Sequence, residues 1–434
     1  MTAADTIFAR ATGAGRAAVG MLRVSGPAAA VVLTSLAGTP PAPRRASLRR
    51  LHDAAGEPLD QALVLWLPGP ASYTGEDSAE LHLHGGPAVL AAVAEALVAA
   101  GARPAEPGEF TRRAFLNGRL DLTEAEGVAD LIEAETEAQR RQALRQASGA
   151  LSRLVAGWSA RLARLLARQE AFIEFEDDDL PAGLDDAVAT EAAALGAEMA
   201  AHLAEAPRGE RLRDGLMVAI IGAPNAGKSS LLNALVGREA AIVSARAGTT
   251  RDVVEARLTL AGVPVTLADT AGLRDATDEI EAEGVRRARR RAEEADLVLA
   301  IFAADQPPDA VTLAAMPAGA VVVVNKADLA PAGLPGALAV SALTGQGLEA
   351  LRARLEAEAA ALAGLGEQAS LTRPRHVAAV RDALRWLAEL SGAPVPELRA
   401  EALRAALRAL GRLTGQVGVE AVLDLVFSEF CIGK

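Results

Sequence analysis

The residues with the clearest chemical pattern lie near the middle of the chain, in Gly222-Ala-Pro-Asn-Ala-Gly-Lys-Ser229. An apolar run precedes them and a helix-like stretch follows, which gives the order strand, glycine-rich loop, helix. The two glycines let backbone N–H groups converge on an anion, and the helix N-terminus adds its positive dipole end. Lys228 would contact the β- and γ-phosphates of a nucleotide, and the Ser229 hydroxyl would ligate Mg²⁺. The pattern predicts a phosphate-binding loop.

Two motifs further along the chain are expected to respond to a γ-phosphate. Asp269-Thr-Ala-Gly272 ends an apolar strand, so its carboxylate can hold Mg²⁺ through water and the Gly272 N–H can contact the phosphate. Gly248-Thr-Thr-Arg-Asp252 lies in a predicted loop, where Thr250 would close over the metal ion. Together these motifs predict a magnesium-dependent nucleoside triphosphate site.

The base is predicted by two motifs that follow later strands. Asn325-Lys-Ala-Asp328 comes after a valine run, and Asp328 can accept hydrogen bonds from both the N1–H and the 2-amino group of guanine. Adenine does not offer this pair of donors. Ser341-Ala-Leu343 follows the next strand and would direct a backbone N–H at the guanine O6. The predicted nucleotide is therefore GTP.

The group that would orient the attacking water is not fixed by these motifs. Leu273 stands where Ras-like GTPases carry a glutamine for this purpose. Acidic residues follow, and one of their carboxylates could polarise water, although they fit equally well as solvated acids at a helix start. These residues are Asp275, Asp278, Glu279, Glu281 and Glu283.

The positive charge for the transition state is also open. Arg251 and Arg274 are nearby in the sequence, but neither can be assigned as an arginine finger. A monovalent cation bound by loop carbonyls and the Asn225 amide oxygen would supply the charge, because carbonyl-type oxygens suit hard cations. Alternatively, Asn225 is a turn residue that follows Pro224.

Composition places these motifs in a multidomain protein. The chain has 434 residues, enough for about three domains. It has no apolar run long enough to span a bilayer, an acid near its N-terminus and a single cysteine, which predict a soluble cytoplasmic protein without an internal disulfide. The net charge of −12 argues against bulk electrostatic binding of nucleic acid but leaves room for a local RNA patch.

The elements that would position these residues predict four segments. Residues 1–118 mix short β-like runs at 19–24, 62–67 and 79–84 with a helix over 88–100, which indicates an α+β domain. Residues 213–363 alternate strands and helices, including a hairpin-like pair at 254–268, which indicates a doubly wound sheet. Helical periodicity dominates 119–212, with one helix expected over 186–204, and returns in 364–434. We therefore expect one discontinuous helical domain into which the nucleotide-binding domain is inserted.

Three smaller patterns in the sequence also bear on function. Gly13–Ala18 resembles a dinucleotide-binding loop, but it precedes a strand instead of following one. His82 and His84 alternate on a predicted strand, and structural or surface roles are favoured over a metal pair because no third ligand is spaced nearby. The chain has only three lysines, Lys228, Lys326 and Lys434, and each falls in or near a motif, where an ammonium is not replaceable by a guanidinium.

Across nearly its whole length the sequence resembles the bacterial tRNA-modification GTPase family MnmE, also called TrmE. Besides the phosphate loop, the resemblance rests on several short motifs. These are Asp5-Thr-Ile, Leu22-Arg-Val-Ser-Gly26, Tyr73-Thr-Gly-Glu-Asp77, His84-Gly-Gly-Pro87, Pro107-Gly-Glu-Phe110, Arg113-Ala-Phe-Leu-Asn-Gly-Arg-Leu-Asp121 and Phe430-Cys-Ile-Gly-Lys434.

The resemblance implies a fold and an activity. The fold would combine an N-terminal folate-binding-like domain that also forms a homodimer, a discontinuous helical domain and an inserted Ras-like P-loop GTPase domain. Members work with the FAD-binding protein MnmG to add an aminomethyl-type group to C5 of the wobble uridine in certain tRNAs, using a tetrahydrofolate-bound carbon. The modification would need GTP hydrolysis, which potassium-dependent dimerisation of the GTPase domains would stimulate.

The resemblance also implies roles for individual residues. Glu281 would orient the catalytic water, Lys228 would act on the phosphates, and Cys431 would be needed for modification. Ser229 and Thr250 would bind Mg²⁺, and K⁺ would bind at Asn225, Ser244, Arg246 and Thr249. Folate would bind at Arg23, Glu80, Arg119 and Lys434. The GTP-binding residues would be Asn225, Ala226, Gly227, Lys228, Ser229, Ser230, Ser244, Thr249, Thr250, Asp269, Thr270, Ala271, Gly272, Asn325, Lys326, Asp328, Ser341, Ala342 and Leu343.

Two other functions remain as alternatives. A ribosome-assembly or regulatory GTPase would share the nucleotide motifs, but it gives no account of the N-terminal domain or of the Cys431 tail. The Cys431-Ile-Gly-Lys434 ending has a cysteine in the position used for prenylation, although its last two residues fit that motif badly. A helical scaffold with an inactive GTPase domain is disfavoured by the complete motif set.

Overall fold

The computed structural model describes residues 5–174, 184–237, 255–269, 290, 292–331, 333–364, 366, 371–393, 395–417, 423, 426, 427, 430 and 433. The chain forms two compact units. The first consists of Met1–Ala129, Gln146–Ala167 and Leu403–Lys434, and the second of Asp130–Arg145 and Arg168–Ala402. Within the described ranges, no helix has the length and apolar character needed to cross a membrane.

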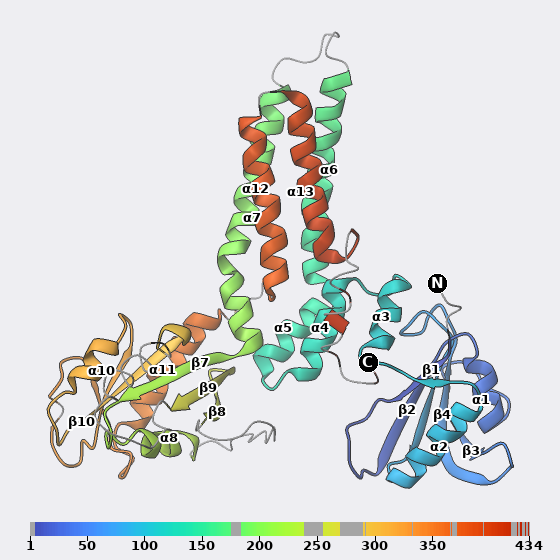
Figure 1. The fold of residues 1–434 in the computed structure, drawn as a ribbon, viewed down its shortest axis with the longest axis horizontal. Helices are drawn as coiled ribbons and strands as arrows, with labels where there is room; N and C mark the ends of the chain where they lie inside the picture. Colours follow the sequence, from blue (N-terminus) through green and yellow to red (C-terminus); the bar gives the residue numbers. More distant parts are fainter. Residues whose placement is uncertain are drawn as a thin grey trace, which may run out of the picture. The chain divides into compact units, whose positions relative to one another are not determined.

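The first unit is built on a six-stranded sheet (Figure 1). Its strands are β1 (Ile7–Arg10), β2 (Val19–Ser25), β3 (Ser47–His52), β4 (Pro58–Leu67), β5 (Ser78–His84) and β6 (Arg103–Pro104). Their order is β3-β4-β5-β2-β1-β6, and each pair is antiparallel except β1 with β6. The helices α1 (Ala29–Ala37) and α2 (Pro87–Ala99) pack on one face through a shared apolar core.

Alternation along β2 and β5 decides which side chains face away from these helices. Leu22, Val24, Leu81 and Leu83 belong to the core beneath α1 and α2. The residues between them, including Arg23, Glu80 and His82, therefore lie on the opposite face. The predicted β-like runs at 19–24, 62–67 and 79–84 and the helix at 88–100 are confirmed within a few residues.

That opposite face is partly covered near β1. The helix α3 (Glu109–Leu116) places Phe110 in a small cluster with Ile7 and Ala9, against which Tyr73 packs. The helix α4 (Leu122–Glu133) follows, and its apolar side packs against residues close to the C-terminus. The members of this second cluster are Leu122, Ala125, Leu423, Val426, Phe427 and Phe430. The last segment of the chain is thus held against α3 and α4.

The second unit contains the other six-stranded sheet. Its strands are β7 (Leu216–Gly222), β8 (Glu255–Leu260), β9 (Val263–Asp269), β10 (Leu297–Ala303), β11 (Val321–Asn325) and β12 (Leu338–Ala339). The order is β12-β11-β10-β7-β9-β8, with all neighbours parallel except the hairpin β8–β9. The central strands β7, β10 and β11 read as nearly continuous apolar runs because a parallel sheet is buried on both faces.

Helices cover both faces of this sheet. The helices α8 (Lys228–Val236) and α11 (Leu348–Ala363) contribute to the apolar core on one face, and α10 (Ala310–Ala315) contributes to the core on the other. This arrangement confirms the predicted doubly wound sheet, including the antiparallel hairpin at its edge.

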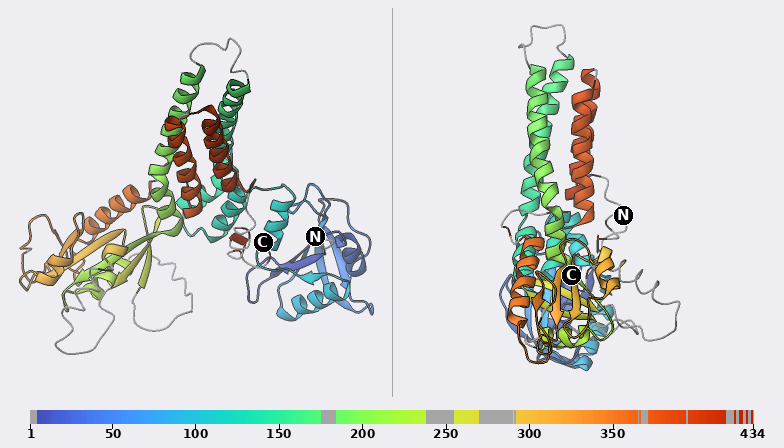
Figure 2. Two further views of the ribbon diagram at one scale, coloured as in Figure 1. Left: turned by 45° about the horizontal axis from the view of Figure 1, so that its top comes forward. Right: turned by 90° about the vertical axis from the view of Figure 1, so that its left-hand side faces the viewer.

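Long helices make up the remaining described part of the chain. They are α5 (Glu137–Ala147), α6 (Ala150–Glu174), α7 (Leu184–Asp214), α12 (Pro374–Gly392) and α13 (Pro396–Thr414). The helices α7 and α12 lie side by side (Figures 1 and 2). The sequence prediction ended α7 near residue 204, ten residues too early, because Pro207 is accommodated inside the helix.

The nucleotide-binding sheet joins the helices at one place. The chain passes from α7 through Gly215 into β7, and it leaves α11 at Gly364. A Cβ added to Gly364 would lie 2.6 Å from the Cδ of Arg208, which belongs to α7. The two connections to the sheet are therefore neighbours, as an inserted domain requires.

Candidate functional site

The phosphate loop depends on glycine at both of its ends. Gly227 has a φ of +87°, and a Cβ at this position would lie 2.2 Å from the Asn325 side-chain nitrogen. A Cβ at Gly222 would lie 2.4 Å from the Ile301 carbonyl oxygen on β10. Both distances are shorter than real Cβ contacts, so a side chain at either position would displace the loop or its neighbours. The strand, loop and helix order predicted for this motif is confirmed.

Lys228 opens α8 and is buried with its ammonium over the loop. Its Nζ donates to the carbonyl oxygens of Gly222 at 2.8 Å and Ala223 at 2.9 Å. Ser229 and Ser230 are exposed in the first turn of the same helix. The loop therefore combines an ammonium, two hydroxyls and a helix N-terminus, which together suit a phosphate group with its metal ion.

Asn325 ties the phosphate loop to the loop that follows β12. Its side-chain nitrogen donates to the Ala226 carbonyl oxygen at 3.0 Å, and its side-chain oxygen accepts from the Ala342 N–H at 3.1 Å. The residue is only 2% exposed, so these bonds are formed away from water. Ser341 is also buried, and its hydroxyl oxygen accepts from the Thr344 N–H at 3.1 Å. The two loops are fixed relative to each other through one amide.

The residues around the predicted base site differ in exposure. Lys326 has a φ of +62°, and its Nζ lies 3.0 Å from an Asp305 carboxylate oxygen at the end of β10. Asp328 is exposed, and Leu343 is 87% exposed. The Asp328 carboxylate, which is predicted to bind guanine, is therefore open to solvent. The nearby Lys326 side chain is held by its ion pair with Asp305.

Several predicted site residues fall outside the described part of the chain. They are Ser244, Arg246, Thr249, Thr250, Thr270, Ala271, Gly272, Glu281, Cys431 and Lys434. Of Asp269 the backbone is described, and it pairs in register with Ile220 of β7, beside the phosphate loop. Of the predicted magnesium and potassium ligands, the structure describes only Ser229 and Asn225. Asn225 has a φ of +63° and lies in a tight turn.

In the first unit, the structure brings together two of the predicted folate residues. Arg23 and Glu80 pair across β2 and β5, and Arg23 donates to one carboxylate oxygen through Nη2 at 2.9 Å and Nε at 3.2 Å. The guanidinium carbon also lies 5.7 Å from the centre of the Tyr73 ring. Both charged side chains are less than one fifth exposed. This little-exposed ion pair, on the sheet face opposite α1 and α2, is a candidate binding site.

The other two folate residues lie at the edges of this region. The stem of Arg119 packs on the turn that carries Tyr73, since a Cβ at Gly75 would lie 3.3 Å from the Arg119 Cγ. Lys434 itself is not described, but a Cβ at its neighbour Gly433 would lie 2.3 Å from the carbonyl oxygen of Arg10, at the end of β1. The C-terminal segment therefore reaches the strand next to β2.

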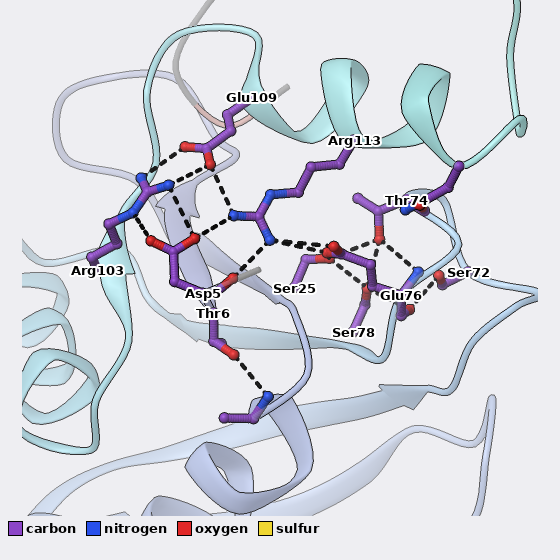
Figure 3. Close-up of polar contacts among 12 residues, drawn as sticks. Asp5, Thr6, Ser25, Ser72, Thr74, Glu76, Ser78, Arg103, Glu109 and Arg113 are labelled. Atoms are coloured by element: carbon purple, nitrogen blue, oxygen red, sulfur yellow. Dashed lines mark hydrogen bonds and ion pairs between the residues drawn. The ribbon is translucent and has the colours of Figure 1, made fainter. Parts of the chain in front are cut away.

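A network of charged groups, absent from the sequence predictions, fixes the turn over 72–78 (Figure 3). Arg113 of α3 donates to a carboxylate oxygen of Asp5 and one of Glu109, each at 2.9 Å, and lies 3.2 Å from Glu76. Arg103 pairs with the same Asp5 and Glu109. Glu76 in turn accepts from the buried Ser25 hydroxyl at 2.8 Å, next to Arg23 on β2.

The arginines of this network favour the ionised form of its carboxyl groups. The hydrogen bonds from Arg103 hold the pKa of Asp5 below its usual value. Burial raises the pKa of Glu109, but hydrogen bonds from Arg103, the Glu106 backbone and Arg113 lower it by more, so its pKa is also depressed. The carboxylates therefore remain charged and keep the turn in place.

The two histidines of β5 have different partners. Nδ1 of His84 lies 2.7 Å from the buried carboxylate of Asp60, while Nε2 of His82 lies 3.5 Å from Glu80. Across the described residues, no group of three or more histidine, cysteine, aspartate or glutamate side chains is arranged to hold a metal ion. The geometry places His84 against Asp60 at the end of β5 and His82 beside the Arg23–Glu80 pair.

Comparison with known proteins assigns both parts of the chain to one protein family. Residues 6–119 match the family model described as the GTP-binding protein TrmE N-terminus, and residues 122–431 match the MnmE helical domain. A tRNA modification GTPase MnmE of Gluconacetobacter diazotrophicus is 60% identical, over 99% of this chain and 98% of that protein. The chain belongs to the MnmE family. The MnmE protein of Granulibacter bethesdensis is 57% identical over 99% of both chains.

The MnmE assignment confirms the predicted family and fold class. The chain combines an N-terminal domain, a helical domain and an inserted Ras-like P-loop GTPase domain, and it is a GTP-binding GTPase of a family named for tRNA modification. Among solved structures, the G domain of the T. maritima FeoB iron transporter is 27% identical over 33% of this chain and 98% of that chain, with a TM-score of 0.26.

Proposed function

We propose that this protein acts in the cytoplasm on the wobble uridine, U34, of certain tRNAs. Together with the FAD-dependent protein MnmG, it would add a carboxymethylaminomethyl-type group to C5 and draw one carbon from a tetrahydrofolate derivative. The observation that carries this proposal is the Arg23–Glu80 pair, which lies on the N-terminal sheet and belongs to no part of the nucleotide site. A regulatory GTPase that acts only as a switch would not need a ligand site on this sheet.

The nucleotide site would drive this reaction through GTP hydrolysis. Bound Mg²⁺ would neutralise charge on the β- and γ-phosphates. Lys228 would hold the same oxygens from the buried side of the loop, and Ser229 and Thr250 would orient the metal ion. The glycine requirements of the loop and the buried position of Lys228 support this assignment.

The charge and the water would be supplied by residues around the loop. K⁺ would bind at Asn225 together with Ser244, Arg246 and Thr249, and Glu281 would orient the attacking water in place of the glutamine that Leu273 replaces. The left-handed turn at Asn225 supports its part in this set, because it exposes the side chain at the rim of the loop.

The N-terminal site would bind 5-formyl- or methylene-tetrahydrofolate through Arg23, Glu80, Arg119 and Lys434. The arrival of Gly433 at the end of β1 supports a contribution from the C-terminal segment, and hence the requirement for Cys431. A homodimer formed through the N-terminal domain agrees with other exposed apolar side chains of the same sheet, which include Val19 and Leu48.

Nucleoside analysis of tRNA tests the proposal. We expect deletion of the gene to remove the C5 modification of U34, as measured by mass spectrometry of total tRNA, and the wild-type gene to restore it. Glu80→Gln should fail to restore it, while Glu57→Gln, an exposed glutamate of the same domain, should succeed. If U34 is modified in the deletion strain to the same extent as in the parent, the proposal is refuted and the ribosome-assembly or regulatory alternative is favoured.

The potassium assignment has its own measurement. GTP turnover of the purified protein should rise when potassium replaces sodium at equal ionic strength, because Na⁺ is too small for a site built for K⁺. Equal turnover in the two salts would remove the cation role of Asn225.

A further inference from the structure

His82 presents a polar atom for which the described residues supply no hydrogen-bond partner. This atom is Nε2, which is buried. The nearest charged group is the second carboxylate oxygen of Glu80, at 3.5 Å, which is too long for a hydrogen bond. Buried polar atoms are nearly always paired, so an unpaired one calls for an explanation such as a ligand.

The same carboxylate has bonding capacity left over. Both hydrogen bonds from Arg23 end on Oε1 of Glu80, whereas the atom facing His82 is Oε2. Oε2 can therefore accept from a ligand N–H. The negative oxygen beside Nε2 of His82 favours the tautomer with its hydrogen on Nε2. At 3.5 Å the two atoms do not form a hydrogen bond, so the N–H can donate to a ligand acceptor.

Apolar side chains surround this pair on the same sheet face. Cross-strand pairing places Met21 of β2 and Leu63 of β4 directly beside His82, and Leu65 of β4 beside Glu80. Leu63 is 40% exposed. Directly paired residues project from the same face of a sheet. The face thus offers an apolar surface for a flat ring, with one acceptor and one donor side by side along its edge.

We propose that His82 and Glu80 together bind the lactam edge of a reduced pterin, in which a ring N–H stands next to a carbonyl. Glu80 Oε2 accepts from the ring N–H, and His82 Nε2–H donates to the 4-oxo oxygen. This inference rests on the proposed folate function and names the part of the ligand that this side of the site recognises. Neither the family resemblance nor the predicted folate set includes His82.

Ligand affinity measured by isothermal titration calorimetry on the full-length protein tests the inference. The probes are 5-formyl-tetrahydrofolate and its 4-amino counterpart, 5-formyl-tetrahydroaminopterin, which lacks the carbonyl acceptor and the neighbouring N–H. The wild type should prefer the 4-oxo ligand by about tenfold or more, because a site built for a hydrogen bond rejects an analogue that cannot form it. His82→Ala should weaken binding of the 4-oxo ligand by about tenfold and reduce the preference by a similar factor.

Two further variants separate recognition from folding. His82→Gln keeps an N–H donor of similar reach and should retain most of the preference, whereas the shorter His82→Asn should lose it. His52→Gln, at the end of β3, is the matched control and should bind both ligands like the wild type. GTP turnover and near-ultraviolet circular dichroism check that each variant is folded.

The outcomes distinguish this inference from the function on which it rests. If the His82 variants bind both ligands like the wild type, or bind both more weakly by one common factor, the lactam contact is overturned and folate binding stands. If the wild type does not bind 5-formyl-tetrahydrofolate, the folate function itself is overturned, and the role of His82 with it.

Discussion

Replacing Asn325 by alanine should uncouple the two loops that form the nucleotide site. Guanine recognition was the role predicted for this motif, yet the Asn325 amide bonds to the protein on both sides, to the Ala226 carbonyl and the Ala342 N–H. The variant removes both hydrogen bonds of the amide while keeping the backbone and the nearby Asp328. It therefore tests whether the amide acts by holding the loops.

The structure sets the size of the effect. Truncation leaves one carbonyl and one N–H without their partner at a residue that is 2% exposed. A buried group left unsatisfied costs about 1–3 kcal/mol, and water entering the vacated space reduces the sum, so we expect about 2–3 kcal/mol. If nucleotide binding must restore the loop arrangement, the dissociation constant rises by about 30- to 150-fold.

Fluorescence titration with a mant-labelled GDP measures this constant on the full chain. Asn233→Ala is the matched control, because Asn233 is an exposed asparagine on α8 of the same domain, and it should bind like the wild type. An affinity of the Asn325 variant within about threefold of the wild type would refute the reasoning, since it would show that the two hydrogen bonds do not hold the loops for the nucleotide.

Three further predictions use other parts of the chain. Gly227→Ala should abolish mant-GDP binding, because its Cβ would lie 2.2 Å from the bridging amide in a left-handed backbone, and binding near the wild-type level would contradict this. Asp130→Asn should lower the thermal unfolding temperature by weakening its pairs with two partly buried arginines, at a cost of about 3 kcal/mol, while the exposed Glu137→Gln should leave that temperature unchanged. The pKa of Glu109 is depressed below 4.5, so its contribution to stability is present above pH 4.5 and is lost as the pH falls through the pKa of the folded state. Arg113→Met should make this loss of stability smaller, as followed by near-ultraviolet circular dichroism during acid titration. An acid transition equal to that of the wild type would contradict this prediction.

The nucleotide site was predictable because its signals are local. The phosphate loop needs a strand, two glycines, Lys228 and a helix within a short stretch, and each has a preference that the sequence displays directly. The hairpin β8–β9 was predicted for the same reason, from two apolar runs joined at Ala261-Gly262. Short-range geometry leaves few alternatives at such places.

The polar network around Asp5 could not be predicted in this way. Its partners are Arg103 and Arg113, 98 and 108 positions away along the chain. With 44 basic and 56 acidic residues, the sequence offers no criterion for choosing these pairs. The strands β1 and β3 were also missed: β1 is only four residues long, and β3 is rich in arginine because it forms the edge of its sheet.

The neighbouring connections of the GTPase domain, where Gly364 lies against Arg208, bear on the order of folding. The helices α7 and α12 pack together although the whole nucleotide-binding sheet separates them in the sequence. Closing a flexible loop of that length would cost on the order of 4 kcal/mol of chain entropy. A GTPase domain that folds first brings its own ends together and removes most of this cost. The helical domain then assembles as though its two halves were joined by a short linker.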